Sequence, residues 1–101
     1  MLLAQVLGTV VSTRKDRGLV GLKLLLTREV DAAFKPSGAF VVAADAVGAG
    51  ADEIVLLAQG SSARMTEVSR EKPVDAVIVG IVDAVEVDGK DVYLKRARAA
   101  R

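Results

Sequence analysis

The segment from Asp75 to Val87 constrains the fold of this chain more than any other part of the sequence. It is rich in β-branched residues, which favour extended strands. On one face of such a strand lie Val77, Val79, Ile81, Val85 and Val87, and on the other lie Ile78, Gly80, Val82 and Ala84. Because both faces are apolar, we expect the strand to be covered on both sides. In a closed barrel one face would line the core, and something else would cover the other.

The rest of the chain is divided into similar short apolar segments by Gly, Asp, Pro and Ser. The predicted strands run from Leu2 to Thr13, Leu19 to Val30, Ala39 to Ala44, Glu53 to Gln59 and Asp91 to Lys95. Hairpin loops are predicted at Asp31 to Gly38 and at Asp88-Gly89, and one or two helical turns after Gly60. We therefore expect an all-β fold, a small closed OB-like β-barrel of about five or six strands with one short helix. An open sandwich is the alternative.

Alternation within the strands predicts which side chains share a face. In the first strand Leu2, Ala4, Val6 and Val10 face one way, and Gly8 is expected at a bend or bulge. In the second strand Leu22, Leu24 and Leu26 face one way, and Lys23, Thr27 and Glu29 face the other. The second strand is therefore predicted to be half-buried.

Composition limits the chemistry and the compartment. We expect one domain over residues 1–101, of which 96–101 form a basic tail, and 14 Lys and Arg stand against 13 Asp and Glu. The charge of +1 lacks the basic excess typical of nucleic-acid binding. His and Cys are absent, which removes imidazole bases, thiolate nucleophiles and Cys/His metal sites. No apolar run approaches the roughly 20 residues that cross a bilayer, and no basic leader precedes the first strand. We predict a cytoplasmic protein.

The apolar content points to assembly. Apolar residues make up 51% of the chain and aromatic residues only 3%, so there are more small aliphatic side chains than a lone core of this size readily hides. Strands that are apolar on both faces can be covered by a neighbouring subunit, and a heterologous interface between such subunits closes into a ring. We therefore expect a cyclic oligomer.

The stretch Gly48-Ala49-Gly50-Ala51-Asp52-Glu53 begins like a phosphate-binding glycine loop. Glu53 stands where the third glycine would be, however, and a strand follows where a helix should begin. We interpret Gly48 and Gly50 as positions of positive φ or of close backbone approach. Exposed amides here would favour a small anion. Asp45, Asp52 and Glu53 lie close enough in sequence to share a hard cation, although simple hydration is the commoner state of such residues.

Two further groups of residues are weighed against ordinary structural roles. Ser61 and Ser62 have no nucleophile-elbow pattern and no His base, and nothing selects Lys15, Lys23, Lys72 or Lys90 as an activating group, so helix capping is the expected role. Lys95, Arg96, Arg98 and Arg101 form a basic cluster that could bind nucleic acid, but the only aromatic residues are Phe34, Phe40 and Tyr93. We predict no catalytic residue, no cofactor and no metal.

Several blocks of the sequence closely resemble the EutN/CcmL family of bacterial microcompartment vertex proteins. The opening of the family is similar to Val6 to Lys15 and Leu19 to Leu25. Its most distinctive stretch is similar to Val42 to Gly50 with Asp52-Glu53, and the later blocks are Gly60 to Arg64 and Lys72 to Asp83. The resemblance extends to Val87, in the family's order. The ending Tyr93 to Arg96 looks most like the carboxysome branch.

The resemblance implies a homopentamer of small β-barrels at the vertices of a polyhedral shell, a carboxysome or a metabolosome. It implies hexameric and trimeric shell proteins as partners and no enzyme activity, nucleic acid or membrane. In the family the stretch from Val47 to Glu53 surrounds the central opening, which here would assign Gly48, Ala49, Gly50, Asp52 and Glu53 to the axis. Val77, Val79, Ile81 and Val82 would belong to the core or the subunit interface. The alternative is a small β-barrel module that binds nucleic acid or another ligand.

Overall fold

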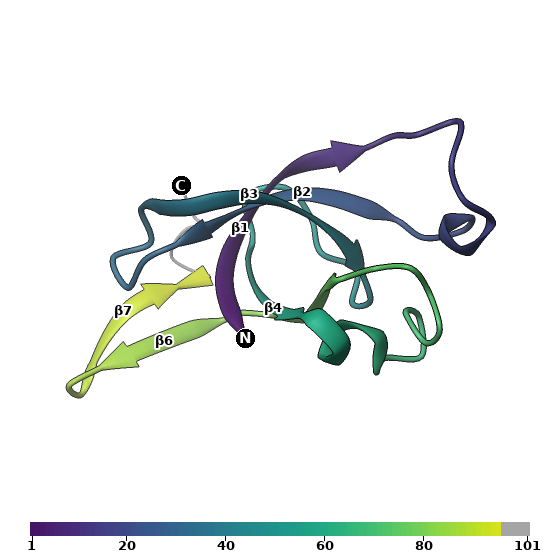
Figure 1. Cartoon of the computed structure of the whole chain (residues 1–101). Helices are drawn as coiled ribbons and strands as arrows, with labels where there is room; N and C mark the ends of the chain where they lie inside the picture. The colour runs from purple at the N-terminus through teal and green to yellow at the C-terminus, as the bar shows by residue number, and fades with distance from the viewer. Residues whose placement is uncertain (96–101) are drawn as a thin grey trace.

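The computed structural model describes residues 1–95 and confirms the all-β barrel. Its strands are β1 (Leu2–Val10), β2 (Leu24–Val30), β3 (Pro36–Asp45), β4 (Ile54–Gln59), β5 (Ala76–Ile81), β6 (Ala84–Val87) and β7 (Lys90–Leu94). Two short 3₁₀ helices are η1 (Arg17–Leu19) and η2 (Gly60–Arg64). Five strands close into a barrel in the order β1-β2-β3-β5-β4, while β6 and β7 form a separate hairpin that projects from it (Figure 1).

The barrel is antiparallel except at one seam. β5 lies between β3 and β4, so it pairs with β3 in parallel through only two registered positions, Ala44 with Val77 and Asp45 with Ile78. The predicted bulge at Gly8 is confirmed, because the register of β1 against β2 shifts between Val6 and Gly8. A bulge bends a strand and increases its twist, which helps a small sheet to close.

Small and branched aliphatic side chains fill the barrel. The buried residues of this cluster are Ala4, Val6, Leu25, Ala43, Ala49, Val55, Leu57, Ala76 and Ile78. Two further clusters lie outside it: one, around Tyr93, joins the β6–β7 hairpin to the barrel, and the other, around Ala63, joins η2 to it. The outer face of the two-sided strand is therefore covered in part by this chain's own elements.

The prediction for the faces of the second strand is wrong. Leu25 and Thr27 are buried inside the barrel, whereas Leu24 and Leu26 lie half-buried on its outside. Thr27 is tolerated there because its hydroxyl donates a hydrogen bond of 2.8 Å to the carbonyl oxygen of Val41. Alternation predicts the wrong faces because both faces of the strand carry leucine. The one polar residue that points inward, Thr27, is accommodated because its hydroxyl is hydrogen-bonded to β3.

Several predicted boundaries also need correction. Pro36 and Gly38 belong to β3, so the turn between β2 and β3 is shorter than predicted. The segment from Asp75 to Val87 is not one strand, because Val82 donates its N–H to Ile54 while the carbonyl of Asp83 accepts from Lys95. The chain thereby leaves the barrel after β5 and enters the hairpin. The predicted turn at Asp88-Gly89 is confirmed, and both residues have positive φ.

Candidate functional site

The loop between β3 and β4, residues 46–53, is anchored to the middle of β1. Asp52 donates its backbone N–H to Val6 at 2.8 Å, and Val6 donates its own N–H to Glu53 at 3.0 Å. Asp52 has φ of 67°, a left-handed conformation that Asp tolerates better than most residues. These bonds fix the loop that the family resemblance assigns to the central opening.

Asp45, at the end of β3, organises the first half of this loop. Its Oδ1 atom accepts hydrogen bonds from the backbone N–H groups of Val47, Gly48 and Ala49, at 3.1, 3.1 and 3.2 Å. The expectation of free amides that attract a small anion is therefore wrong for these three groups, because a carboxylate of the chain already fills that position. The same bonds give Asp45 a structural role in holding the first half of the loop.

Three small residues of the loop, Gly48, Ala49 and Gly50, have different roles. Gly48 has φ of 79° and open space where a side chain would start, so its conformation alone explains the glycine. Ala49 is buried as a member of the cluster that fills the barrel. Gly50 lacks a positive φ, and a Cβ there would stand 3.4 Å from the Glu53 carboxylate. Of the two predicted alternatives, positive φ is confirmed for Gly48, whereas Gly50 has neither a positive φ nor a neighbouring backbone that approaches it closely.

Glu53 ties the second half of the loop to the end of β7. Its Oε1 accepts the N–H of Gly50 at 2.5 Å, and its Oε2 forms an ion pair of 2.5 Å with the Lys95 ammonium. The hydrogen bond from Lys95 lowers the pKa of the Glu53 carboxyl below its usual value. Partial burial acts in the opposite direction, and the hydrogen bond from Gly50 lowers the pKa further. The same pair raises the pKa of Lys95. Among residues 1–95, no group of three His, Cys, Asp or Glu residues could hold a metal ion.

The residues expected in the core or at a subunit interface divide into two kinds. Val77 and Val82 are buried within the subunit, whereas Val79 and Ile81 are half-buried. Val77 and Val79 belong to the cluster beneath η2, Ile81 contacts the barrel core, and Val82 contacts the cluster around Tyr93.

The structure gives little support to the catalytic and nucleic-acid alternatives. Ser61 and Ser62 lie exposed inside η2, and among residues 1–95 neither hydroxyl is hydrogen-bonded to a lysine. The expected capping role is wrong, because the N-cap is Gln59 and no side chain caps the helix. The ring centroids of Phe34 and Tyr93 lie 5.0 Å apart, and Tyr93 is buried. The Arg28 guanidinium lies over the ring of Phe40, so the aromatic rings contact other side chains of the subunit. Arg96, Arg98 and Arg101 of the predicted basic cluster lie outside the described residues.

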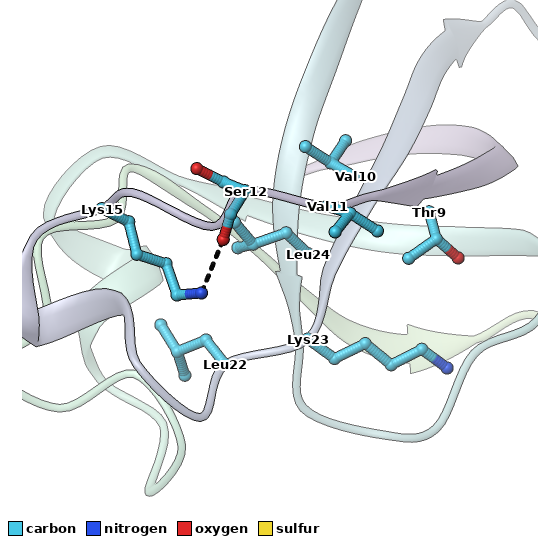
Figure 2. A pocket seen from close by; sticks show the side chains of 8 residues that line it. All are labelled: Thr9, Val10, Val11, Ser12, Lys15, Leu22, Lys23 and Leu24. Atoms are coloured by element: carbon cyan, nitrogen blue, oxygen red, sulfur yellow. Dashed lines mark hydrogen bonds between the residues drawn. The ribbon is translucent and has the colours of Figure 1, made fainter.

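A second feature is a hollow of about 230 Å³ where β1 ends and β2 begins. Figure 2 shows Lys15 reaching back across it, with its ammonium bonded at 2.7 Å to the carbonyl oxygen of Ser12. The remaining lining residues are Thr9, Val10, Val11, Leu22, Lys23 and Leu24. The lining thus combines four apolar side chains with two lysines. Within residues 1–95, no helix is long and apolar enough to span a membrane.

The fold of this chain, a closed five-stranded barrel with a projecting hairpin, is similar to those of several solved structures. The structure of CcmL from Gloeobacter violaceus superposes with a TM-score of 0.90 at 48% identity, covering 95% of this chain and 99% of that one. The model of the family described as ethanolamine utilisation protein EutN/carboxysome matches residues 1–83. The chain belongs to this EutN/CcmL family.

Individual relatives come from more than one kind of compartment. The carboxysome shell vertex protein CcmL of Gloeobacter violaceus is 48% identical over 95% of this chain and 96% of its own length. The bacterial microcompartment shell vertex protein EutN of Salmonella typhimurium is 46% identical over 94% of this chain and 96% of its own length. The pentameric microcompartment shell protein GrpN from Rhodospirillum rubrum superposes with a TM-score of 0.77 at 46% identity, covering 86% of this chain and 98% of its own.

Two residues of the site have roles that the sequence analysis does not predict. Asp45 is a candidate metal ligand there, although an Asp at the start of a loop that contains Gly commonly accepts hydrogen bonds from the next backbone amides. Lys95 was grouped with the basic tail, but it pairs with Glu53. No local signal in the sequence joins Glu53 to Lys95, since 41 residues lie between them.

Proposed function

We propose that this chain is a shell vertex protein, which forms a homopentamer and closes the five-fold corners of a bacterial microcompartment. The observation that carries the proposal is the near-complete match, in both sequence and fold, to proteins named as shell vertex proteins. The GrpN structure adds that a barrel of this family forms a pentamer. The role is structural, without catalysis, and the protein works inside the bacterial cell as part of the shell.

The physical basis is geometric. Hexagonal tiles form a flat sheet, so a closed polyhedron needs five-fold positions that introduce curvature. In this proposal hexameric and trimeric shell proteins surround each pentamer. The loop that carries Gly48, Ala49, Gly50, Asp52 and Glu53 surrounds the five-fold axis. Bonds within the subunit favour this role, because Asp45 accepts three backbone N–H groups of the loop and Glu53 pairs with Gly50 and Lys95.

Native mass spectrometry and negative-stain imaging of the purified chain test the first step. We expect a five-membered ring. Co-expression with hexameric shell proteins, with and without this chain, tests the second step, and we expect closed polyhedra only when it is present. A chain that stays monomeric at micromolar concentration, or shells that close equally well without it, would overturn the proposal. Single-stranded DNA binding by that monomer would then favour the alternative module.

A further inference from the structure

Opposite charges occupy opposite ends of this molecule. The connection from β1 to β2, residues 11–23, forms an arm at one end, and the hairpin of β6 and β7, residues 83–94, projects at the other (Figure 1). The arm carries Arg14, Lys15, Arg17 and Lys23 against the single acid Asp16. The hairpin carries Asp83, Glu86, Asp88 and Asp91 against Lys90. The whole chain is nearly neutral, so this separation is not a consequence of its composition.

Most of these charges lack a partner inside the subunit. All of them are exposed, and the one ion pair among residues 1–95 joins Glu53 to Lys95 rather than any two of them. Glu86 and Asp91 moreover stand directly opposite each other in the register of the hairpin. Like charges in that position destabilise a strand pair. A positive surface brought from outside the subunit would remove this repulsion.

Both ends also expose apolar side chains. Val11 and Val20 of the arm are 83% and 62% exposed. Val87, Val92 and Leu94 of the hairpin are 44%, 44% and 43% exposed. A two-stranded hairpin is marginally stable by itself, and Tyr93 holds only one side of this one against the barrel. The hollow lined by Lys15 and Lys23 lies beside Val11 and is open to an incoming apolar residue.

We propose that the β6–β7 hairpin of one subunit docks on the β1–β2 arm of the next subunit around the ring. The two surfaces are different and lie at opposite ends of the chain, as a heterologous contact that closes into a ring requires. Complementary charge sets the register, and the valines exclude water between the surfaces. This inference rests on the proposed pentamer. The family model ends at residue 83, where the hairpin begins.

Charge reversal and its rescue test the contact in the full-length protein. One variant carries Lys15→Glu and Lys23→Glu, a second carries Glu86→Lys and Asp91→Lys, and a third carries all four changes. Native mass spectrometry over a dilution series measures the concentration at which the ring dissociates. We expect each double variant to dissociate at a concentration at least about tenfold higher than the unchanged protein, because losing one subunit breaks two contacts. The fourfold variant should return to within about threefold.

A matched control separates a local contact from net charge. Glu67→Lys with Glu71→Lys gives the same change of charge as the hairpin variant at exposed positions outside it, and it should leave dissociation unchanged. Circular dichroism checks that every variant folds. A pentamer whose dissociation is unaffected by either double variant, or one that the fourfold variant fails to restore, overturns the hairpin contact alone. An unchanged protein that never forms a ring overturns the proposed function instead.

Discussion

At the scale of single residues, Asp45 does within the chain what a bound anion would do from outside. Its carboxylate takes up three successive amides of the loop, so the loop needs no ligand to hold its shape. Glu53 likewise accepts a hydrogen bond from the N–H of Gly50, and it forms an ion pair with Lys95. Gly48 and Gly50 therefore matter for the geometry of the backbone. They do so differently, because only Gly48 has a positive φ.

Substitution at the two loop glycines should separate their roles. Gly48→Ala should lower the free energy of unfolding by about 1–2 kcal/mol, because an L-residue at φ of 79° is strained even where its side chain has room. Gly50→Ala should cost clearly less, since its φ is ordinary and its new Cβ would make only van der Waals contact. Urea denaturation of both variants measures the difference. Equal losses would mean that Gly48 is not constrained as described.

The Glu53–Lys95 pair predicts a specific pH dependence. Because the folded pKa of Glu53 is lowered, its contribution is present at neutral pH and is lost as the pH falls through that lowered value. Because the folded pKa of Lys95 is raised, its contribution is lost only as the pH rises through that raised value. Glu53→Gln should therefore lower the urea midpoint at pH 7, and the difference from the unchanged protein should vanish once the pH falls below the lowered pKa of Glu53.

Lys95→Met provides the control for that pair. It should reproduce the loss at pH 7, and the double variant should lose little more than either single variant, because the two residues act through one interaction. Additive losses would show that each residue stabilises the fold independently of the other. The effect should also shrink in high salt, since both side chains are partly exposed.

At the scale of elements, hydrophobic alternation located the strands well and their faces less well. The turn at Asp88-Gly89 and the bulge at Gly8 can be predicted because Asp-Gly and an isolated Gly in a strand favour these geometries. The faces of β2 do not, because Leu24, Leu25 and Leu26 are chemically alike and only the partner strands decide which one points inward. Likewise, nothing in the apolar run before Asp83 marks where β5 ends, since a hydrogen bond from Val82 to Ile54 sets that point.

The face assignment of β2 can be tested directly. Leu25→Ala should cost about 2–5 kcal/mol, because it opens a cavity in the closed barrel. Leu26→Ala should cost the isolated subunit much less, since that side chain lies half-buried on the outside. Denaturation under conditions where the protein is monomeric gives the comparison. A larger loss at Leu26 would restore the original prediction for this strand.

At the scale of the whole molecule, the sequence predicted a closed barrel but not the order of strands within it. The deciding contact joins β3 to β5 in parallel, across the loop, β4 and η2. No periodicity in either strand carries that information. The axial position of the loop and the contacts between subunits also depend on other copies of the chain. Within one subunit, the evidence for them is limited to the bonds that hold the loop, the exposed apolar side chains and the distribution of charge.

That parallel seam also bears on when a subunit becomes competent to assemble. Ala44 and Asp45 can close the barrel only after Val77 and Ile78 have been synthesised, so most of the chain must leave the ribosome before the fold exists. Asp45 is at once the last residue of the seam and the organiser of the candidate axial loop. A chain that ends or opens before β5 cannot complete the barrel, so barrel closure must come before a subunit is ready to assemble.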